Sequence, residues 1–470
     1  MAKINQLLDT GRRALSNSQT GIATVAHNIA NKSTEGYSRQ RVELVANQPV
    51  GEGQLRIGTG AKASQVTRTN NPWLEKQIQK EDTLTGFQDS RSQSLARVEQ
   101  IYNEQQNKGL NQYMTDFFNG FRELSNNPES LASRTMVKES ASALTKDFGR
   151  VNEQLRGVQN DLDGQIQVSV GEINQAAKEI ASLNEKILGV EVQGNVANDE
   201  RDRRDLMIKK LGEKVDITWA EGKDGMVSIT AGNTAILVSG MSSNELIAKT
   251  TGERDRTEVF FKNSENGTLF QITNNFTGGK LGGCLEVRDK TIEEFVAKND
   301  ELAYNLAKEV NSLHIEGYDR YGKKGVLFFE QPESVKGASQ KIKVNNTVLN
   351  DVGRIAAGEK AFAPGDNTVS NMISSLQHRA TMRDGSATFD DFYSTQVGEV
   401  GALAQRAQKA FEAQKNIKEQ MSNIRESISG VSLDEETTKM IEMQKSYEAS
   451  ARVIKVADEM FDTILSLKRM

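Results

Sequence analysis

The sequence contains little of what catalytic and metal sites are usually built from. Its 470 residues include one cysteine, Cys284, and three histidines, His27, His314 and His378, which lie far apart in the chain. These residues do not have the spacing of a zinc site. There is also no Gly-x-Ser-x-Gly motif, no His-Glu-x-x-His motif and no phosphate-binding loop. We therefore expect no enzyme activity, no metal and no cofactor, and we expect Cys284 to be a small buried hydrophobic residue.

Long apolar runs are also absent. The longest in the first 30 residues is Ile22–Ala26, which Thr24 interrupts, and no cleavage site follows it. No segment approaches the roughly 18 apolar residues of a membrane span. We therefore expect no membrane span, and a chain that either stays in the cytoplasm or leaves it without a cleaved signal peptide.

An excess of basic charge is missing as well. Lysine and arginine total 59 against 64 for aspartate and glutamate, a net charge of −5, which argues against a nucleic-acid partner. Hydrophobic residues make up only 36%, which is low for a compact enzyme of this size. Five prolines occur, none of them inside the long periodic segments. This composition favours an elongated helical protein.

What the sequence does contain is a narrow apolar seam at each end. Both seams have the helical spacing that coiled coils use, so each helix needs a partner to cover its apolar face. That partner is either the other end of the same chain or a neighbouring copy. The N-terminal seam consists of Ile4, Leu8, Leu15, Ile22, Val25 and Ile29. The C-terminal seam includes Tyr447, Ile454, Phe461, Ile464 and Leu465.

Long helical patterns dominate the region between the ends. The longest runs from about Ser130 toward Leu188, which corresponds to about 85 Å of helix. Helical periodicity returns between Ile292 and Leu313 and again between Leu403 and Val431. These segments predict a rod of long helices.

Strand signals interrupt this rod. Ile217–Ala220 and Val227–Thr230 flank Asp224-Gly225, a hairpin pattern. Further short apolar segments follow up to Thr273, with an Asn266-Gly267 turn before the last of them. They predict a small inserted antiparallel β domain.

The predicted fold is therefore α+β, mostly α, elongated and divided into several domains. We expect residues 1–40 and 432–470 to form a terminal coiled-coil domain, and residues 41–212 and 286–431 to form a helix-rich rod domain. Residues 213–285 are expected to form the β domain.

Three polar or glycine-rich features have simple structural interpretations. The mixed charges of residues 199–205 are expected to form local ion pairs that contribute little each. Gly278–Gly283 does not fit the phosphate-loop pattern and is expected to connect a strand to a helix. His27 lies beside the N-terminal seam and is expected to make an interhelical hydrogen bond.

The segments His27–Asn31 and Ser33–Gln40 resemble the N-terminal signature of the bacterial flagellar axial proteins, the family of rod, hook and hook-associated proteins. Segments within Phe117–Arg134, Ala197–Asp205 and Gly279–Arg288, and the motif Gly430–Glu436, make the chain most similar to the first of the two junction proteins between hook and filament. The residues that carry the terminal motifs are Asn28, Asn31, Thr34, Gly36, Tyr37, Arg39, Leu433, Asp434 and Glu435.

This resemblance implies a structural subunit that joins hook to filament and is required for filament assembly. It implies contacts with further copies of the chain, with the hook protein and with the second junction protein. It also implies type III export to the flagellum and a cytoplasmic chaperone on the C-terminal helix. Longer members carry more outer-domain sequence, whereas residues 317–388 look too short for a full extra domain, so we expect one outer domain.

Two other functions remain open from the residues. One is an intracellular coiled-coil adaptor, whose β domain would bind a ligand. The other is a different axial protein, of the hook or the rod. A third function, a cell-wall hydrolase carried on a flagellar scaffold, is disfavoured because the sequence contains none of the catalytic motifs named above. Recovery in sheared flagella, rather than in the cytosol, would separate the junction protein from the adaptor.

Overall fold

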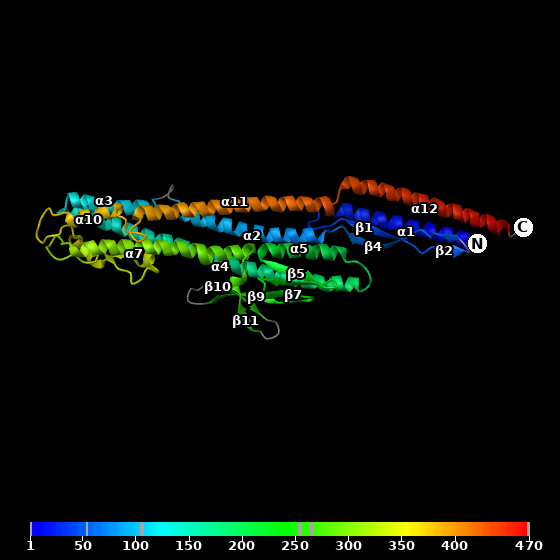
Figure 1. The fold of residues 1–470 in the computed structure, drawn as a ribbon, viewed down its shortest axis with the longest axis horizontal. Helices are drawn as coiled ribbons and strands as arrows, with labels where there is room; N and C mark the ends of the chain where they lie inside the picture. Colours follow the sequence, from blue (N-terminus) through cyan, green and yellow to red (C-terminus); the bar gives the residue numbers. More distant parts are fainter. Residues whose placement is uncertain (1, 53–54, 104–107, 252–255, 263–266, 468–470) are drawn as a thin grey trace.

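The computed structural model describes residues 2–52, 55–103, 108–251, 256–262 and 267–467, which form an elongated, mostly helical molecule with small antiparallel sheets (Figure 1). This confirms the predicted fold class. Both termini lie at one end of the molecule. Among the described helices, none combines the length and the apolar character needed to cross a membrane.

The elements alternate between long helices and short strands. The α-helices are α1 (Ala2–Ala30), α2 (Pro72–Ile101), α3 (Leu110–Asn126), α4 (Leu131–Glu191), α5 (Asn198–Lys214), α6 (Gly279–Glu286), α7 (Ile292–Glu316), α8 (Ala338–Lys341), α9 (Asn346–Asn350), α10 (Thr368–Ser375), α11 (Phe389–Ser429) and α12 (Leu433–Leu467). The strands are β1 (Gln40–Ala46), β2 (Val50–Glu52), β3 (Leu55–Ile57), β4 (Ala61–Arg68), β5 (Ile217–Glu221), β6 (Val227–Ala231), β7 (Ala235–Ser239), β8 (Ser242–Ser243), β9 (Glu245–Thr251), β10 (Arg256–Lys262), β11 (Leu269–Gln271), β12 (Phe329–Glu330) and β13 (Lys343–Val344).

The long helices begin at capping residues. The side chain of Asn71 accepts the first backbone N–H groups of α2, and Pro72 occupies the first turn, where its missing N–H is not needed. Ser130 caps α4 in the same way. Thr388 and Asp391 form a capping box at the start of α11. Local sequence therefore sets where α2, α4 and α11 start.

The two ends of the chain form one antiparallel helical pair. Each terminal seam therefore packs against the helix at the other end of the same chain. Gly11 of α1 lies against Ile454 of α12, while Gly21 lies against Met443. The hairpin of β1 and β4 packs on α1, where the side chain of Asn17 donates to the carbonyl of Ala61 (2.8 Å). We call α1, α12 and this hairpin the terminal unit (Figure 1).

The rod is built on α4, whose 61 residues correspond to about 90 Å of helix. Helices α2 and α11 lie beside each other along the rod. At the end opposite the termini, the phenylalanines of α3 contact two phenylalanines near β12, with ring centroids 4.8 to 5.8 Å apart. These rings are Phe117, Phe118, Phe121, Phe328 and Phe329. The rod is therefore held by a continuous apolar core.

The inserted β elements form two sheets on one side of the rod, in the orders β5-β6-β7-β8 and β11-β10-β9. Strand β5 pairs with β6 across the expected Asp224-Gly225 hairpin. The short strand β8 was not predicted. The expected Asn266-Gly267 turn includes residue 266, which lies outside the described residues.

The glycine-rich segment is only partly the connection that was predicted. Helix α6 already begins at Gly279, so Gly282 and Gly283 are helical. A Cβ atom on Gly283 would lie 2.6 Å from the carbonyl oxygen of Phe87 in α2. Glycine is needed here because α6 and α2 approach each other closely. Cys284, the next residue, is buried as expected.

His314 is fully buried near the end of α7. The N–H of Ala356 donates to its Nε2 (2.8 Å), so the other ring nitrogen carries the proton and donates to the carbonyl of Val326 (2.6 Å). Burial lowers the pKa of His314 from 6.5 to about 4. Protonation would place a second donor against the N–H of Ala356, so the folded protein holds this ring neutral.

We expect His314 to make stability depend on pH below 6.5. The unfolded chain binds a proton near pH 6.5, but the folded chain does so only near pH 4, so stability is lost as the pH falls between these values. The loss approaches about 3 kcal/mol. A His314→Gln variant should be less stable than the parent in urea at pH 7.5, and the gap should narrow at pH 4.5. The control is His378→Gln, at an exposed position. A gap for His314→Gln that does not change with pH would contradict this account.

Candidate functional site

The signature residues of the N-terminal segment lie where the terminal unit meets the rod. Segments from α1, the 31–39 loop, β1, β4, α2, α5, α11 and α12 converge there, and most of their polar side chains are buried. We call this cluster the polar junction. Its members are Asn28, Tyr37, Ser38, Arg39, Gln40, Arg68, Glu75, Asp202, Arg425 and Glu436.

Asn28 is buried at its centre and uses its whole side-chain amide. The Nδ2 group donates to the carbonyl of Gln40 and to Glu436 Oε2, both at 2.8 Å. The Oδ1 atom accepts the backbone N–H of Gln40 (2.9 Å) and the hydroxyl of Tyr37 (2.8 Å). Both donors and both lone pairs are therefore satisfied. The amide pairs with the backbone of Gln40 as a neighbouring strand would.

Arg39 links the N-terminal signature to the C-terminal motif. Its Nε donates to Glu436 Oε1 at 2.8 Å, and its Nη2 lies 2.9 Å from Glu435. The carboxylate of Glu436 is almost fully buried and also receives Asn28. Breaking such a pair is costly, because a buried charge is left without its partner.

The backbone of residues 36–40 bonds to a different element at almost every step. The carbonyls of Gly36 and Tyr37 accept from the guanidinium of Arg425 in α11, at 3.1 and 3.2 Å. The N–H of Arg39 donates to the carbonyl of Ser429, the last residue of α11 (2.8 Å). The carbonyl of Arg39 accepts the N–H of Thr69 (2.7 Å). Gly36 has φ +81°, a conformation that favours glycine. The segment therefore ties the terminal unit to α11 and, within that unit, bonds to the residue that follows β4.

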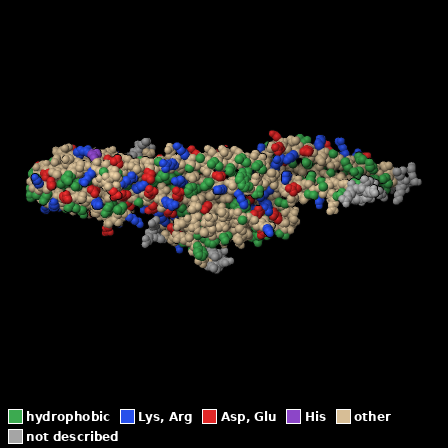
Figure 2. All heavy atoms as spheres, viewed as in Figure 1, with side chains coloured by type: hydrophobic (Ala, Val, Ile, Leu, Met, Phe, Trp, Pro, Cys, Tyr) green, Lys and Arg blue, Asp and Glu red, His purple; other side chains and the backbone are tan. Residues whose placement is uncertain are grey.

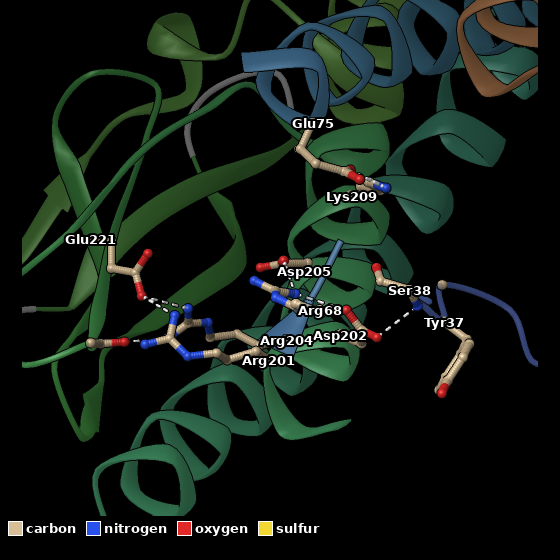
Figure 3. A network of polar contacts seen from close by, with 12 residues as sticks. Tyr37, Ser38, Arg68, Glu75, Arg201, Asp202, Arg204, Asp205, Lys209 and Glu221 are labelled. Atoms are coloured by element: carbon tan, nitrogen blue, oxygen red, sulfur yellow. Dashed lines mark hydrogen bonds and ion pairs between the residues drawn. The ribbon is translucent and has the colours of Figure 1, made fainter. Parts of the chain in front are cut away.

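Asp202 of α5 supports the segment from the other side. It accepts the N–H of Ser38 at 2.7 Å and pairs with Arg68 at 2.8 Å, and Arg68 also reaches Asp205 (2.7 Å). Figure 3 shows Arg68 lying between the two carboxylates, with Ser38 close to Asp202. Burial, together with the nearby carboxylates of α5 and α12, raises the pKa of Tyr37, so its phenol stays a donor.

The prediction of local ion pairs within residues 199–205 was wrong. Arg201 forms a bidentate ion pair with Glu191 of α4 (2.6 and 2.9 Å) and a further hydrogen bond to Glu221 of β5 (2.6 Å). Arg204, almost fully buried, binds Glu221 (3.0 Å) and the carbonyl of Gly225 in the β5–β6 turn (2.5 Å) (Figure 3). The charges of α5 therefore join distant parts of the chain, the β domain on one side and the polar junction on the other.

A second ion-pair group holds α2 against α5 and α11. Glu75 of α2 receives Arg425 Nε at 3.1 Å and pairs with Lys209 of α5. Because Arg425 also binds the carbonyls of Gly36 and Tyr37, one guanidinium connects α11, α2 and the N-terminal segment. Guanidinium groups suit such sites because their donors lie in a fixed planar fork.

The apolar seam residues line the contact between α1 and α12 to different extents. Val25 is buried, and the other N-terminal seam residues are half-buried, namely Ile4, Leu8, Leu15, Ile22 and Ile29. Tyr447, Ile454 and Phe461 are half-buried on α12. Ile464 and Leu465 are exposed in the single chain. The contact therefore covers each seam only in part.

The remaining signature residues lie around the end of α1 and the start of α12. Asn31 donates to the carbonyl of His27 (3.0 Å) and receives the hydroxyl of Thr34 (3.1 Å), beyond the last turn of α1. Leu433 is exposed at the first position of α12, and the carbonyl of Asp434 accepts two threonine hydroxyls.

His27 was predicted to make an interhelical hydrogen bond, but its hydrogen-bond partner is Tyr37 in the loop after α1, and its contact with another helix is a longer one to Asp199 of α5. Its Nδ1 lies 3.1 Å from the hydroxyl of Tyr37, and its Nε2 lies 3.6 Å from Asp199 of α5. It therefore belongs to the rim of the polar junction. No three His, Cys, Asp or Glu side chains within the described residues could together hold a metal ion.

Sequence reasoning missed the partners of the signature, above all Glu436, Arg68 and Arg425. The N-terminal signature contains a basic residue, Arg39, and the C-terminal motif ends in an acidic run that contains Glu436. That charge match between the two terminal motifs was the available signal. The arrangement fixes how the terminal unit is attached to the rod.

Three family descriptions match this chain. "Flagellar hook-associated protein FlgK helical domain" matches residues 95–329. "Flagella basal body rod protein" matches residues 8–37, and "Flagellar basal body rod FlgEFG protein C-terminal" matches residues 425–467. The two shorter matches cover the segments that the structure brings together in the terminal unit and the polar junction.

Whole-chain relatives extend these matches. The chain is 30% identical to flagellar hook-associated protein 1 of Bacillus subtilis, over 98% of this chain and 97% of that protein. It is 23% identical to the Escherichia coli protein of the same name, over 99% and 100% of the two chains. The flagellar hook junction protein FlgK from Burkholderia pseudomallei has a similar fold, with a TM-score of 0.68 at 15% identity over 75% of this chain and all of that one.

Proposed function

The chain belongs to the flagellar hook-associated protein 1 family, and from this we propose that it is a structural subunit of the junction between the hook and the filament of the bacterial flagellum. It acts by assembly and carries out no reaction. The filament requires it because a filament subunit needs a matching surface on which to start.

The observation that supports this proposal best is the joining of the two chain ends into one unit at one end of a rod. The polar junction holds that unit at a set position relative to α5 and α11 through buried hydrogen bonds and ion pairs. A subunit that must present the same surface at every position in a ring needs such a fixed attachment. A flexible adaptor has no need of it.

We propose that the three parts of the chain have different roles, with the β1–β4 hairpin belonging to the terminal unit and not to the rod domain in which the sequence analysis placed residues 41–212. The terminal unit supplies contacts between copies, through the two seams. The helical rod surrounds this inner layer, and the β domain between residues 213 and 285 lies outermost.

The partners follow from that layout. Further copies of the chain contact the terminal unit, and the hook protein and the second junction protein contact the two ends of the ring they form. Before export through the type III apparatus, a cytoplasmic chaperone covers the C-terminal helix, since an exposed apolar stripe promotes aggregation. The chain then reaches the flagellum without a cleaved signal peptide.

A deletion and fractionation experiment tests the proposal. Cells lacking the chain should keep hooks but lose filaments, and a plasmid copy should restore both filaments and swimming. The chain should be recovered in sheared flagella by mass spectrometry. Normal filaments in the deletion strain, or recovery of the chain only in the cytosol, would favour the adaptor.

A further inference from the structure

Helix α12 carries a second apolar stripe beside the seam that faces α1, and the two rows share Ile464. Its residues repeat at intervals of three and four, so they share one face of the helix. Four of them are 39 to 49% exposed, a large fraction for apolar side chains in one row. We call this row the outer stripe, and it consists of Ala449, Val453, Val456, Met460 and Ile464. Figure 2 shows hydrophobic side chains on the surface of α12.

The terminal unit also contains an apolar groove of about 380 Å³. It lies between α1, the β1–β4 hairpin and the first half of α12, and its lining includes the small residues Ala14 and Gly21. Val25, Val42 and Met443 add apolar walls, and Leu44 is 56% exposed at its edge. Small residues at a helix surface allow another helix to approach closely.

The outer stripe cannot fill the groove of its own chain. The groove uses residues of α12 between Glu436 and Ser446, and the stripe lies farther along the same continuous helix, from Ala449 to Ile464. A straight helix cannot fold its second half back into a groove that its first half lines. The outer stripe can therefore enter this groove only from another copy of the chain.

The dimensions of the two surfaces match. The groove follows α1 from Thr10 to Val25, and the stripe runs from Ala449 to Ile464. Both correspond to about 22 Å of helix. No charged residue lies within the stripe, so the stripe brings no charge into the contact. The groove itself is lined in part by Arg41 of β1 and by Glu436 and Lys439 of α12. A second copy of this chain supplies such a helix in each neighbouring subunit.

We propose that the outer stripe of one copy packs into the groove of a second copy, and that this contact joins adjacent terminal units. The proposal rests on the proposed function, because it describes how subunits of a junction ring meet. It adds which two surfaces touch. The stripe continues the α1–α12 interface around the same helix, so each α12 contacts α1 of its own chain and the groove of a neighbour.

Photocrosslinking in flagella tests this contact. The full chain would carry p-benzoylphenylalanine at Val456 in the deletion strain, and sheared flagella would be irradiated. We expect a crosslinked dimer of this chain whose linked peptide contains α1 residues 10–25 or β1 residues 42–44. The control places the same probe at Glu448, which lies on α12 away from the stripe, and should yield at most a tenth as much of this product.

Three other outcomes of the crosslinking experiment would contradict the contact between stripe and groove. A dimer linked from Val456 to Val456, or a product with a different flagellar protein, overturns the stripe-to-groove pairing while leaving the junction function intact. Crosslinking only to a cytosolic chaperone, with none in flagella that contain the chain, also overturns it. Absence of the chain from flagella overturns both the proposed function and this contact.

A charge in the stripe gives an independent measurement. Val456→Glu should keep the helical content of the purified monomer, because Val456 is 45% exposed, and should lower its amount in sheared flagella at least tenfold. The Ser466→Glu control adds the same charge on another face of α12 and should be incorporated at the parental level. Equal incorporation of Val456→Glu and the parent would overturn the proposal.

Discussion

A Phe461→Asp variant is expected to lose incorporation into flagella while its rod and β domain stay folded. Phe461 is half-buried in the seam between α12 and α1, so a carboxylate there would be drawn from water into an apolar contact. Burying a charge without a partner costs several kcal/mol, which is more than the half-buried packing of α12 on α1 can offset. The phenylalanine cluster of the rod lies at the far end of the molecule and should not be affected.

Two measurements check this expectation. The amount of the variant in sheared flagella should fall by at least tenfold, and the monomer should lose amide protection only in α1 and α12. Ser466→Asp adds the same charge to an exposed position five residues later, and it should assemble normally. Filaments of normal number and length on Phe461→Asp cells would contradict a packing role for the seam.

A Glu436→Ala variant is expected to loosen the start of α12 from α1 and from the 31–39 loop. The change leaves Arg39 with Glu435 alone and removes one of the two acceptors of the Asn28 amide. Breaking a buried ion pair costs about 3–5 kcal/mol. We expect about 3 kcal/mol, because Arg39 keeps one partner and is partly exposed.

Hydrogen exchange measures this effect locally. Amides near the start of α12 and the end of α1 should exchange about 100-fold faster in Glu436→Ala, as about 3 kcal/mol requires. The matched control is Glu448→Ala on the same helix, which removes an exposed pair with Lys445 and should change exchange by no more than a few-fold. Equal effects of the two substitutions would show that burial of Glu436 contributes nothing.

Periodicity and turn chemistry predicted the parts of the fold that depend on local sequence. The seams of α1 and α12, the long helix α4 and most strands of the β domain follow from residue spacing within one segment. The β5–β6 hairpin, for example, needs only two short apolar runs and Asp224-Gly225 between them. The positions of Gly282 and Gly283 were less predictable, because their reason is the distance between α6 and α2.

The polar junction could not be predicted in the same way. Asn28 and Glu436 are 408 residues apart in the chain, and a hydrogen bond between them produces no repeating pattern. The α5 charges show the same problem, since Asp202 and Arg204 have opposite charges at short spacing yet bind partners on opposite sides of the helix. Resemblance identified the signature residues, but only the three-dimensional arrangement shows what each one holds.

The bonds that join the terminal unit to the rod have a mechanical consequence. Asp202 of α5 holds Ser38 and Arg68, and Arg425 of α11 holds the carbonyl of Gly36, so any tilt of the terminal unit would stretch several of these bonds together. Bonds that fail together resist small bending strongly and then give way at once, as expected of packed, bistable contacts. The attachment should therefore behave as a stiff joint with a threshold. A ring of such joints would pass torque from one tube to the next with little loss to bending.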